Sequence, residues 1–102
     1  MAPRDQIIAG DALQRRIAGL PGWRTDGTAI FRTYAIAYDD AIKAVGEIGQ
    51  AAIALEHRPD IDIRWATLNV YLTTHTAGDV VTELDFMTAA RIDEIAGRHG
   101  AA

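Results

Sequence analysis

Cysteine is absent from this chain of 102 residues, which excludes a disulfide framework and any metal site built on thiolates. This absence is typical of a protein from a reducing compartment. Long apolar segments are lacking as well: no run of aliphatic residues exceeds the five from Ala51 to Leu55, whereas a membrane-spanning helix needs roughly 20. The first residues include no apolar signal region. We therefore expect a soluble, cytoplasmic protein that has no membrane partner.

An excess of positive charge is also missing. The formal net charge is -4, the sequence pI is near 5.2, and the basic residues are scattered along the chain. Direct binding to nucleic acid is therefore not expected, because the phosphate backbone attracts a basic stripe or patch. A hydrophobic content of 49% in a chain of this length predicts one domain over residues 1–102, with a single core.

Apolar residues at steps of three and four predict two helices in the first half of the chain. The first helix should occupy about 11–19, because Asp11 and Gln14 form a capping-box pattern in front of an apolar stripe. The second helix should occupy about 38–56, where the apolar stripe is long and charged residues lie on the other faces. This long amphipathic helix is expected to be the central one.

Alternating polar and apolar residues predict four strands in two hairpins. Trp23–Thr25 and Ala29–Ala35 flank Asp26-Gly27, a dipeptide that accepts the positive φ angles of a tight hairpin turn. Asp62–Trp65 and Thr67–Thr74 are the strands of the second hairpin, and the latter alternates clearly.

A third helix is predicted from Thr82 to about residue 97. Thr82 and Asp85 resemble a capping box, with Asp in the place where Glu or Gln is more usual. The residues from Gly97 onwards are expected to fray, which leaves His99 exposed to solvent.

The predicted element order is α-β-β-α-β-β-α. This order predicts an α+β fold, in which a four-stranded antiparallel sheet is covered on one face by three helices. A sheet face or edge that remains unprotected must be covered by something, so we expect a homo-oligomer.

Two histidines lie where predicted elements end, and they are the candidate catalytic groups. Pro59 disfavours helical geometry at Arg58, which leaves His57 in the last turn or cap of the central helix. His75 follows the last predicted strand. Imidazoles suit paired proton transfer, although a single histidine at a helix end is more often a capping or surface residue. Their spacing matches no familiar zinc pattern, so no metal is expected.

Other residues near the histidines have a functional and a structural interpretation each. Arg58 cannot exchange protons, so it can bind or stack against a planar ligand with carbonyl groups, or it is a solvated charge. Asp85 can orient an imidazole, or it only stabilises the first turn of its helix. Trp65 and Tyr71 can stack on a flat heterocycle, but aromatic residues of hairpins more often belong to a core or an interface. Trp23 is expected in the core.

Several short motifs, taken in order, resemble the pterin-4a-carbinolamine dehydratases, which are also described as dimerisation cofactors of a homeodomain transcription factor. The resemblance covers nearly the whole chain. The motifs are Leu20-Pro21-Gly22-Trp23, Ile30 to Tyr34, Tyr38-Asp39-Asp40-Ala41, His57-x-Pro59, Thr74-His75, Thr82-x-x-Asp85 and Ala89-Ala90-Arg91-Ile92-Asp93.

The resemblance implies an activity and a set of site residues. The activity is that of a lyase: the removal of water from a 4a-hydroxytetrahydropterin to give the quinonoid dihydropterin, with no metal and no bound cofactor. His57 and His75 would be the acid and base at the 4a-hydroxyl and N5, with Asp85 supporting them. We also expect Arg58, Pro59, Trp65 and Thr74 to bind the substrate. The resemblance also implies homodimers or homotetramers.

Three departures from the family pattern support a second hypothesis. Arg58 stands where the family usually has a second histidine, and Ile53 stands where an acidic residue is common. The loop between His75 and Asp85 is one residue longer than in better-known members, with Asp79 where glycine is frequent. The alternative is therefore a family-like binding or assembly protein with a protein client. Examples are a dimerisation cofactor or an assembly factor for the carbon-fixing enzyme of carboxysomes.

Overall fold

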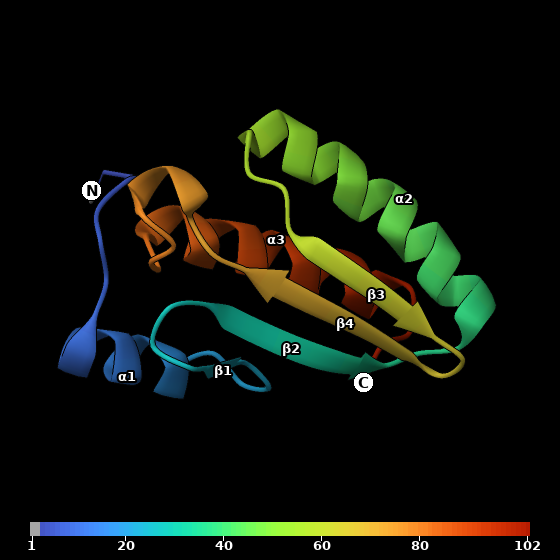
Figure 1. Ribbon diagram of the computed structural model, residues 1–102. Helices are drawn as coiled ribbons and strands as arrows, with labels where there is room; N and C mark the ends of the chain where they lie inside the picture. The colour runs from blue at the N-terminus through green and yellow to red at the C-terminus, as the bar shows by residue number, and fades with distance from the viewer. Residues whose placement is uncertain (1–2) are drawn as a thin grey trace.

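A computed structural model of the protein describes residues 3–102, and it shows one antiparallel sheet with helices on one side (Figure 1). Relative to the expected order, the chain adds one short 3-10 helix, η1, before the last helix. The elements are α1 (Gly10–Ala18), β1 (Arg24–Thr25), β2 (Ile30–Ala35), α2 (Tyr38–Leu55), β3 (Asp60–Arg64), β4 (Thr67–Leu72), η1 (His75–Ala77) and α3 (Glu83–Arg98). The predicted α+β fold is thereby confirmed.

The sheet has the strand order β1-β2-β4-β3, and every pair of neighbours is antiparallel. Its two central strands turn alternate side chains to the helices, and most of these side chains are fully buried. The fully buried ones of β2 and β4 are Ile30, Tyr34, Leu68, Val70 and Leu72, and Arg32 on the same face is half-buried. On the opposite face, where Figure 1 shows no helix, the rings of Phe31 and Tyr71 stack with centroids 6.1 Å apart.

The three helices agree with the predicted ranges to within one or two residues, but the first one begins differently. We expected Asp11 and Gln14 to form a capping box, whereas α1 begins at Gly10 and its N-cap residue, Ala9, has no capping side chain. Asp11 lies inside the first turn, where its charge interacts favourably with the helix dipole. Within residues 3–102, no helix is long and apolar enough to cross a membrane.

The first strand of the second hairpin begins and ends earlier in the chain than predicted. β3 runs over Asp60–Arg64 instead of 62–65, because Ile61 and Ile63 both turn toward the helices and extend the alternation by two residues. Arg64 pairs with Thr67, which places Trp65 in the connecting turn and not in a strand.

The first hairpin forms at the predicted position, although its loop is longer than a two-residue turn. Residues 26–29 connect β1 to β2, and the Asp26 carboxylate accepts hydrogen bonds from the backbone N–H groups of Thr28 and Ala29. Gly27 supplies the positive φ of 97° that the prediction required.

The end of the chain was expected to fray, and the structure shows it paired instead. Ala102 and Ala35 exchange two backbone hydrogen bonds, of 2.9 and 3.1 Å, so the last residue is held beside the end of β2. His99 is half-buried, and its Nε2 contacts the carboxylate of Glu47 on α2. The backbone hydrogen bonds therefore hold this segment in place, although its side chains are small.

A single carboxylate, that of Asp93, joins α3 to the sheet. It accepts hydrogen bonds from Trp23 Nε1 at 3.0 Å, from Arg32 Nη1 at 3.0 Å and from the Tyr34 hydroxyl. Gly22 allows this arrangement, because a Cβ at that position would lie 2.7 Å from the Arg32 guanidinium, and its φ of 86° suits glycine. The Gly22-Trp23 pair is therefore a structural motif, and Trp23 lies in the core as predicted.

Tyr34 gives this polar cluster a testable pH dependence. Burial, followed by the hydrogen bond to Asp93, raises the pKa of Tyr34 well above its ordinary value of 10.0. Above pH 10 the unfolded chain loses this proton while the folded protein keeps it, so the free energy of unfolding should fall by about 1.4 kcal/mol per pH unit. Tyr34→Phe should flatten that slope between pH 10 and 11 in urea unfolding, whereas Tyr38→Phe, at an exposed site, should not. Parallel profiles for the parent and Tyr34→Phe would contradict this account.

Candidate active site

The most completely buried carboxylate of the described chain belongs to Asp85, in the first turn of α3. Its exposed fraction is 0%, and Oδ2 accepts a hydrogen bond of 2.8 Å from the Thr82 backbone N–H. Thr82 and Asp85 are the ends of a capping box, as predicted, and the box fixes the carboxylate relative to the helix axis. A buried charge costs a great deal unless it is paired, so the other partners of Asp85 decide what it does.

His57 is the first of those partners. Glu56 adopts the left-handed conformation (φ 54°) that ends α2, and the next residue turns inward with its N–H bonded to the Ala52 carbonyl. The His57 Nε2 lies 2.5 Å from Asp85 Oδ1, and only 8% of the residue is exposed. Within residues 3–102, Nδ1 has no hydrogen-bond partner. The carboxylate therefore favours a ring with its proton on Nε2, and it stabilises the imidazolium form that proton uptake at Nδ1 would create.

Two threonine hydroxyls complete the surroundings of the Asp85 carboxylate. Thr74 Oγ1 donates to Asp85 Oδ2 at 2.8 Å and lies 2.8 Å from Thr82 Oγ1. Thr74 follows β4 and its backbone N–H bonds to the carbonyl of Val80, which closes the η1 loop against the start of α3. The four polar side chains form one buried cluster, in which the end of α2, the end of β4 and the start of α3 meet. We call His57, Thr74, Thr82 and Asp85 the buried cluster.

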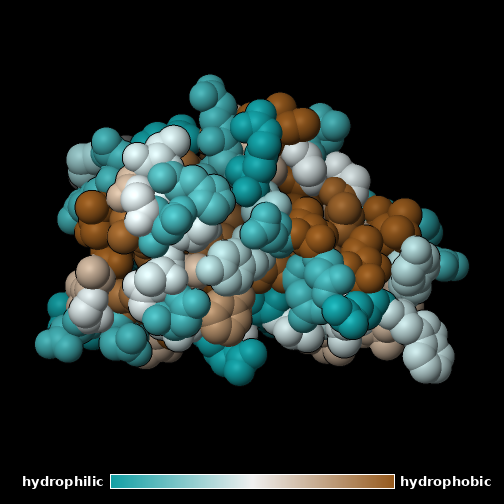
Figure 2. Space-filling model, viewed as in Figure 1, coloured by the Kyte–Doolittle hydropathy of each residue, from teal (hydrophilic) through white to brown (hydrophobic). Residues whose placement is uncertain are grey.

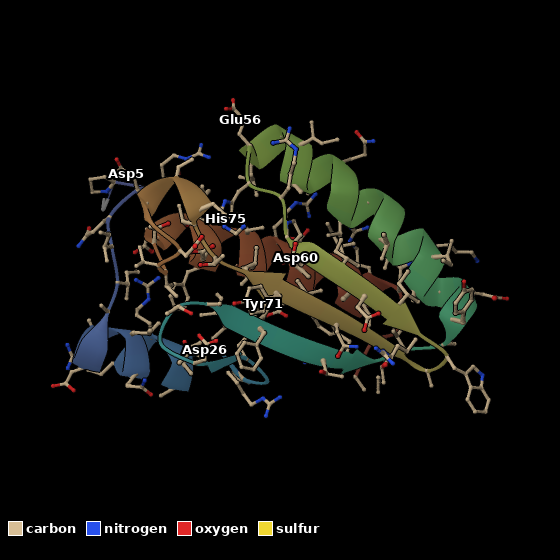
Figure 3. The ribbon with its side chains drawn as sticks, viewed as in Figure 1. Asp5, Asp26, Glu56, Asp60, Tyr71 and His75 are labelled. Carbon is tan, nitrogen blue, oxygen red and sulfur yellow. The ribbon has the colours of Figure 1, made fainter. Side chains whose placement is uncertain are left out.

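His75 lies beside the buried cluster in sequence but outside it in space. We expected it to continue the last strand, whereas it begins η1, because the Thr74–Val80 bridge turns the chain away from the sheet. Its side chain is 74% exposed, and Nδ1 lies 2.5 Å from Asp79 Oδ1. Figure 3 shows His75 at the same end of the sheet as Glu56 and Asp60. Each histidine is therefore paired with a carboxylate: the His57–Asp85 pair is buried, and the His75–Asp79 pair lies in solvent.

The residues expected to bind substrate do not all lie near the buried cluster. Arg58 is exposed and Pro59 is half-buried, and both follow His57 directly. Trp65 lies at the opposite end of β3, in the turn that leads to β4, and 88% of it is exposed. Five strand residues at about 3.3 Å each separate it from the buried cluster by roughly 17 Å. Within one copy of the chain, Trp65 is not brought to the other candidate residues.

Sequence analysis did not predict the contacts that Thr82 and Asp79 make to the candidate residues. Thr82 was predicted only as a cap, and Asp79 was noted only as a departure from the family pattern. A carboxylate four residues after a histidine can pair with it once the loop turns, and this spacing was the available signal for Asp79. The Thr74–Thr82 contact joins residues eight apart through a β-bridge, which no local pattern indicates.

A cavity of about 510 Å³ adjoins the buried cluster. Thr74 and Thr82 form part of its wall, and the N-terminal residues 3–5 form another part. Leu84 N–H donates to the Arg4 carbonyl at 2.8 Å, which holds this N-terminal segment over the start of α3. Neither candidate histidine lines the cavity. Among residues 3–102, no three His, Asp or Glu side chains are grouped so that they could hold a metal ion.

Comparison with known proteins finds a matching family model and similar sequences over most of the chain. The model of the family described as pterin 4 alpha carbinolamine dehydratase matches residues 7–95. A "Putative pterin-4-alpha-carbinolamine dehydratase" of Mycobacteroides abscessus is 39% identical over 93 residues, covering 90% of this chain and 98% of that protein. A protein of Roseiflexus sp. with the same description is 40% identical over 84 residues, covering 81% and 89% of the two chains.

Two solved structures have a similar fold. A transcriptional coactivator/pterin dehydratase from Brucella melitensis aligns with a TM-score of 0.82 and 27% identity, over 90% of this chain and all of that one. A pterin dehydratase-like protein identified as a RuBisCO assembly factor in the alpha-carboxysome aligns with a TM-score of 0.63. Its identity is 23%, over 76% of this chain and 93% of that one, so this second likeness concerns the fold alone.

The pairing of Asp85 predicts a large effect of its charge on stability. Asp85→Asn keeps the shape of the side chain but leaves the buried donors of His57, Thr74 and Thr82 with fewer acceptors, so it should cost about 1–3 kcal/mol. The matched control is Asp39→Asn, which removes an exposed carboxylate from the first turn of α2 and should cost less than about 1 kcal/mol. Urea unfolding measures both losses. Equal losses for the two variants would show that Asp85 acts only through the helix dipole.

Proposed function

This chain belongs to the pterin 4 alpha carbinolamine dehydratase family, and we propose that it catalyses the dehydration of a 4a-hydroxytetrahydropterin to the quinonoid dihydropterin. The observation that supports this activity best is the 2.5 Å contact between His57 and the fully buried Asp85. An imidazole held by a buried carboxylate, with its second nitrogen unpaired within the described chain, is suited to accept a proton.

The proposed reaction is balanced by two proton transfers. One proton is delivered to the hydroxyl at C4a, the C–O bond breaks, and water leaves. One proton is removed from N5, and the electron pair of the N–H bond forms the C4a–N5 double bond. We assign the removal at N5 to His57, because Asp85 stabilises the imidazolium that results. His75, exposed and paired with Asp79, is assigned to the hydroxyl.

The substrate-binding assignments of Arg58, Pro59 and Thr74 rest on their positions next to the two histidines. Arg58 and Pro59 continue directly from His57, and a flat guanidinium can stack on a pterin ring or donate hydrogen bonds to its carbonyl group. Thr74 belongs to the buried cluster and immediately precedes His75, so it links the positions of the two histidines. Arg58 would thus keep a binding role at a position where it cannot transfer protons.

A second candidate function is that of a catalytically weakened binding or assembly protein. The observation that favours it is the placement of His75, which is 74% exposed and paired away from the buried cluster. The cavity beside the cluster is lined by neither histidine. In this alternative the fold and the exposed surfaces serve a protein client, and the buried cluster keeps only its structural role.

The rate of 4a-hydroxytetrahydropterin dehydration separates the two functions. The purified parent should exceed the spontaneous rate, and His57→Ala and His75→Ala should each lose about 10²–10⁴-fold, the usual contribution of a general acid or base. His99→Ala is the matched control, because the third histidine contacts Glu47, outside the site, and its loss should leave the rate within about twofold.

Two outcomes would contradict the dehydratase function. A parent rate equal to the spontaneous rate would exclude it. Activity that appears only in Arg58→His would identify a binding protein built on a site that has lost a proton-transfer group.

A further inference from the structure

The first turn of α3 is bonded to the segment that precedes α1. The first four N–H groups of a helix have no partner within the helix and need other acceptors. In α3, two of these groups are bonded within the capping box. Of the other two, Glu83 N–H donates to the Gln6 carbonyl at 3.0 Å. Leu84 N–H donates to the Arg4 carbonyl at 2.8 Å. The N-terminal segment therefore completes the start of this helix.

The last carbonyl of α2 has its partner in the same segment. α2 ends at Leu55, and its last turn, residues 52–55, contains no basic residue, although the helix dipole favours a cation there. The Leu55 carbonyl instead accepts a hydrogen bond from the guanidinium of Arg4, 51 residues earlier in the chain. A charged donor makes a stronger hydrogen bond than a neutral one. Arg4 therefore supplies both a donor and a positive charge to this helix end.

Arg4 thus contacts the two helix ends that lead to the candidate active site. His57 follows Leu55 by two residues, and Asp85 follows Leu84 by one. The backbone of Arg4 is bonded beside the carboxylate, and its side chain is bonded beside the histidine. Arg4 lies outside the part of the chain that the family model matches, so the family pattern gives this contact no role.

We propose that Arg4 is a positioning residue that fixes the end of α2 to the start of α3 and thereby holds His57 against the Asp85 carboxylate for proton transfer. The link between the two helix ends is independent of the proposed function, whereas its effect on catalysis rests on that function. Arg4 itself transfers no proton, because a guanidinium stays charged at any ordinary pH. It acts through the Leu55 carbonyl and the turn that follows.

The turn between Leu55 and His57 makes the imidazole sensitive to this link. Only Glu56 separates the two residues, and its left-handed conformation (φ 54°) costs free energy for a residue with a Cβ. Such a conformation persists where the surrounding structure fixes it. His57 N–H is bonded to the Ala52 carbonyl at 3.0 Å on the helix side of the turn, and Arg4 holds the carbonyl that begins the turn. A shift of about 1 Å in this turn would be enough to slow proton transfer.

The N-terminal segment has further bonds to the start of α3, so the Arg4 side chain can be removed without releasing the segment. Ile8 N–H donates to the Val81 carbonyl at 2.9 Å, and Ile7 forms a β-bridge with Thr82. These bonds hold the segment where it runs past the start of α3 (Figure 1). A substitution of Arg4 therefore changes the link to α2 and leaves the pairing beside α3 in place.

Steady-state kinetics test the effect on catalysis. Arg4→Ala should lower kcat roughly tenfold with KM within about twofold, because the imidazole of His57 is kept but held less firmly. Arg4→Lys should recover most of the rate, since an ammonium can also donate to the Leu55 carbonyl. Arg15→Ala, which removes an exposed arginine of α1, is the matched control and should leave kcat unchanged. With an active parent, an Arg4→Ala variant that keeps the parent kcat would overturn the positioning role.

Amide hydrogen exchange tests the link itself without an assay of activity. Arg4→Ala should speed the exchange of His57 N–H at least about fivefold, because the end of α2 then opens more often. Arg4→Lys and Arg15→Ala should leave this rate near that of the parent. Ile8 N–H, which has its own partner, is the internal reference and should exchange at the parent rate in all variants.

The two measurements separate a failure of this inference from a failure of the proposed function. A parent without dehydratase activity would contradict the proposed function, and hydrogen exchange would still decide whether Arg4 fixes the end of α2. An exchange rate of His57 N–H that is the same in Arg4→Ala as in the parent would overturn the link.

Discussion

The buried carboxylate of Asp85 is the constraint on which this end of the molecule depends. It closes the capping box of α3, receives the hydroxyl of Thr74 from the end of β4, and contacts the ring of His57 after α2. A charge with 0% exposure is tolerated only with such partners, so three elements must meet in one arrangement. The same arrangement fixes the orientation of the imidazole. Both folding and the proposed chemistry therefore require the Asp85 carboxylate to contact His57.

Local patterns explain how much of this arrangement could be predicted. The three helices follow from apolar periodicity, and the capping box at Thr82 and Asp85 follows from a local hydrogen bond between residues three apart. The residue type allowed Asp85 to orient an imidazole, and the family resemblance gave it a supporting role, but neither identified His57 as its partner. The turn of the chain at His75 could not be predicted, because it depends on the Thr74–Val80 bridge, which no local pattern indicates.

The position of Trp65 shows a second limit of sequence analysis. It was assigned to the substrate because an aromatic ring can stack on a flat heterocycle, yet the register of β3 with β4 carries it to the far end of the hairpin. A sequence pattern gives the order of residues along the chain and does not say at which end of a strand pair each of them will lie.

The most direct test of the central claim is the ¹⁵N NMR spectrum of the His57 ring in the folded protein. If Asp85 holds this ring, the neutral form should carry its proton on Nε2, with Nδ1 free as the acceptor, and Asp85→Asn should abolish that preference. A ring protonated on Nδ1, or a tautomer unchanged in Asp85→Asn, would contradict the claim that the buried carboxylate prepares His57 to take up a proton.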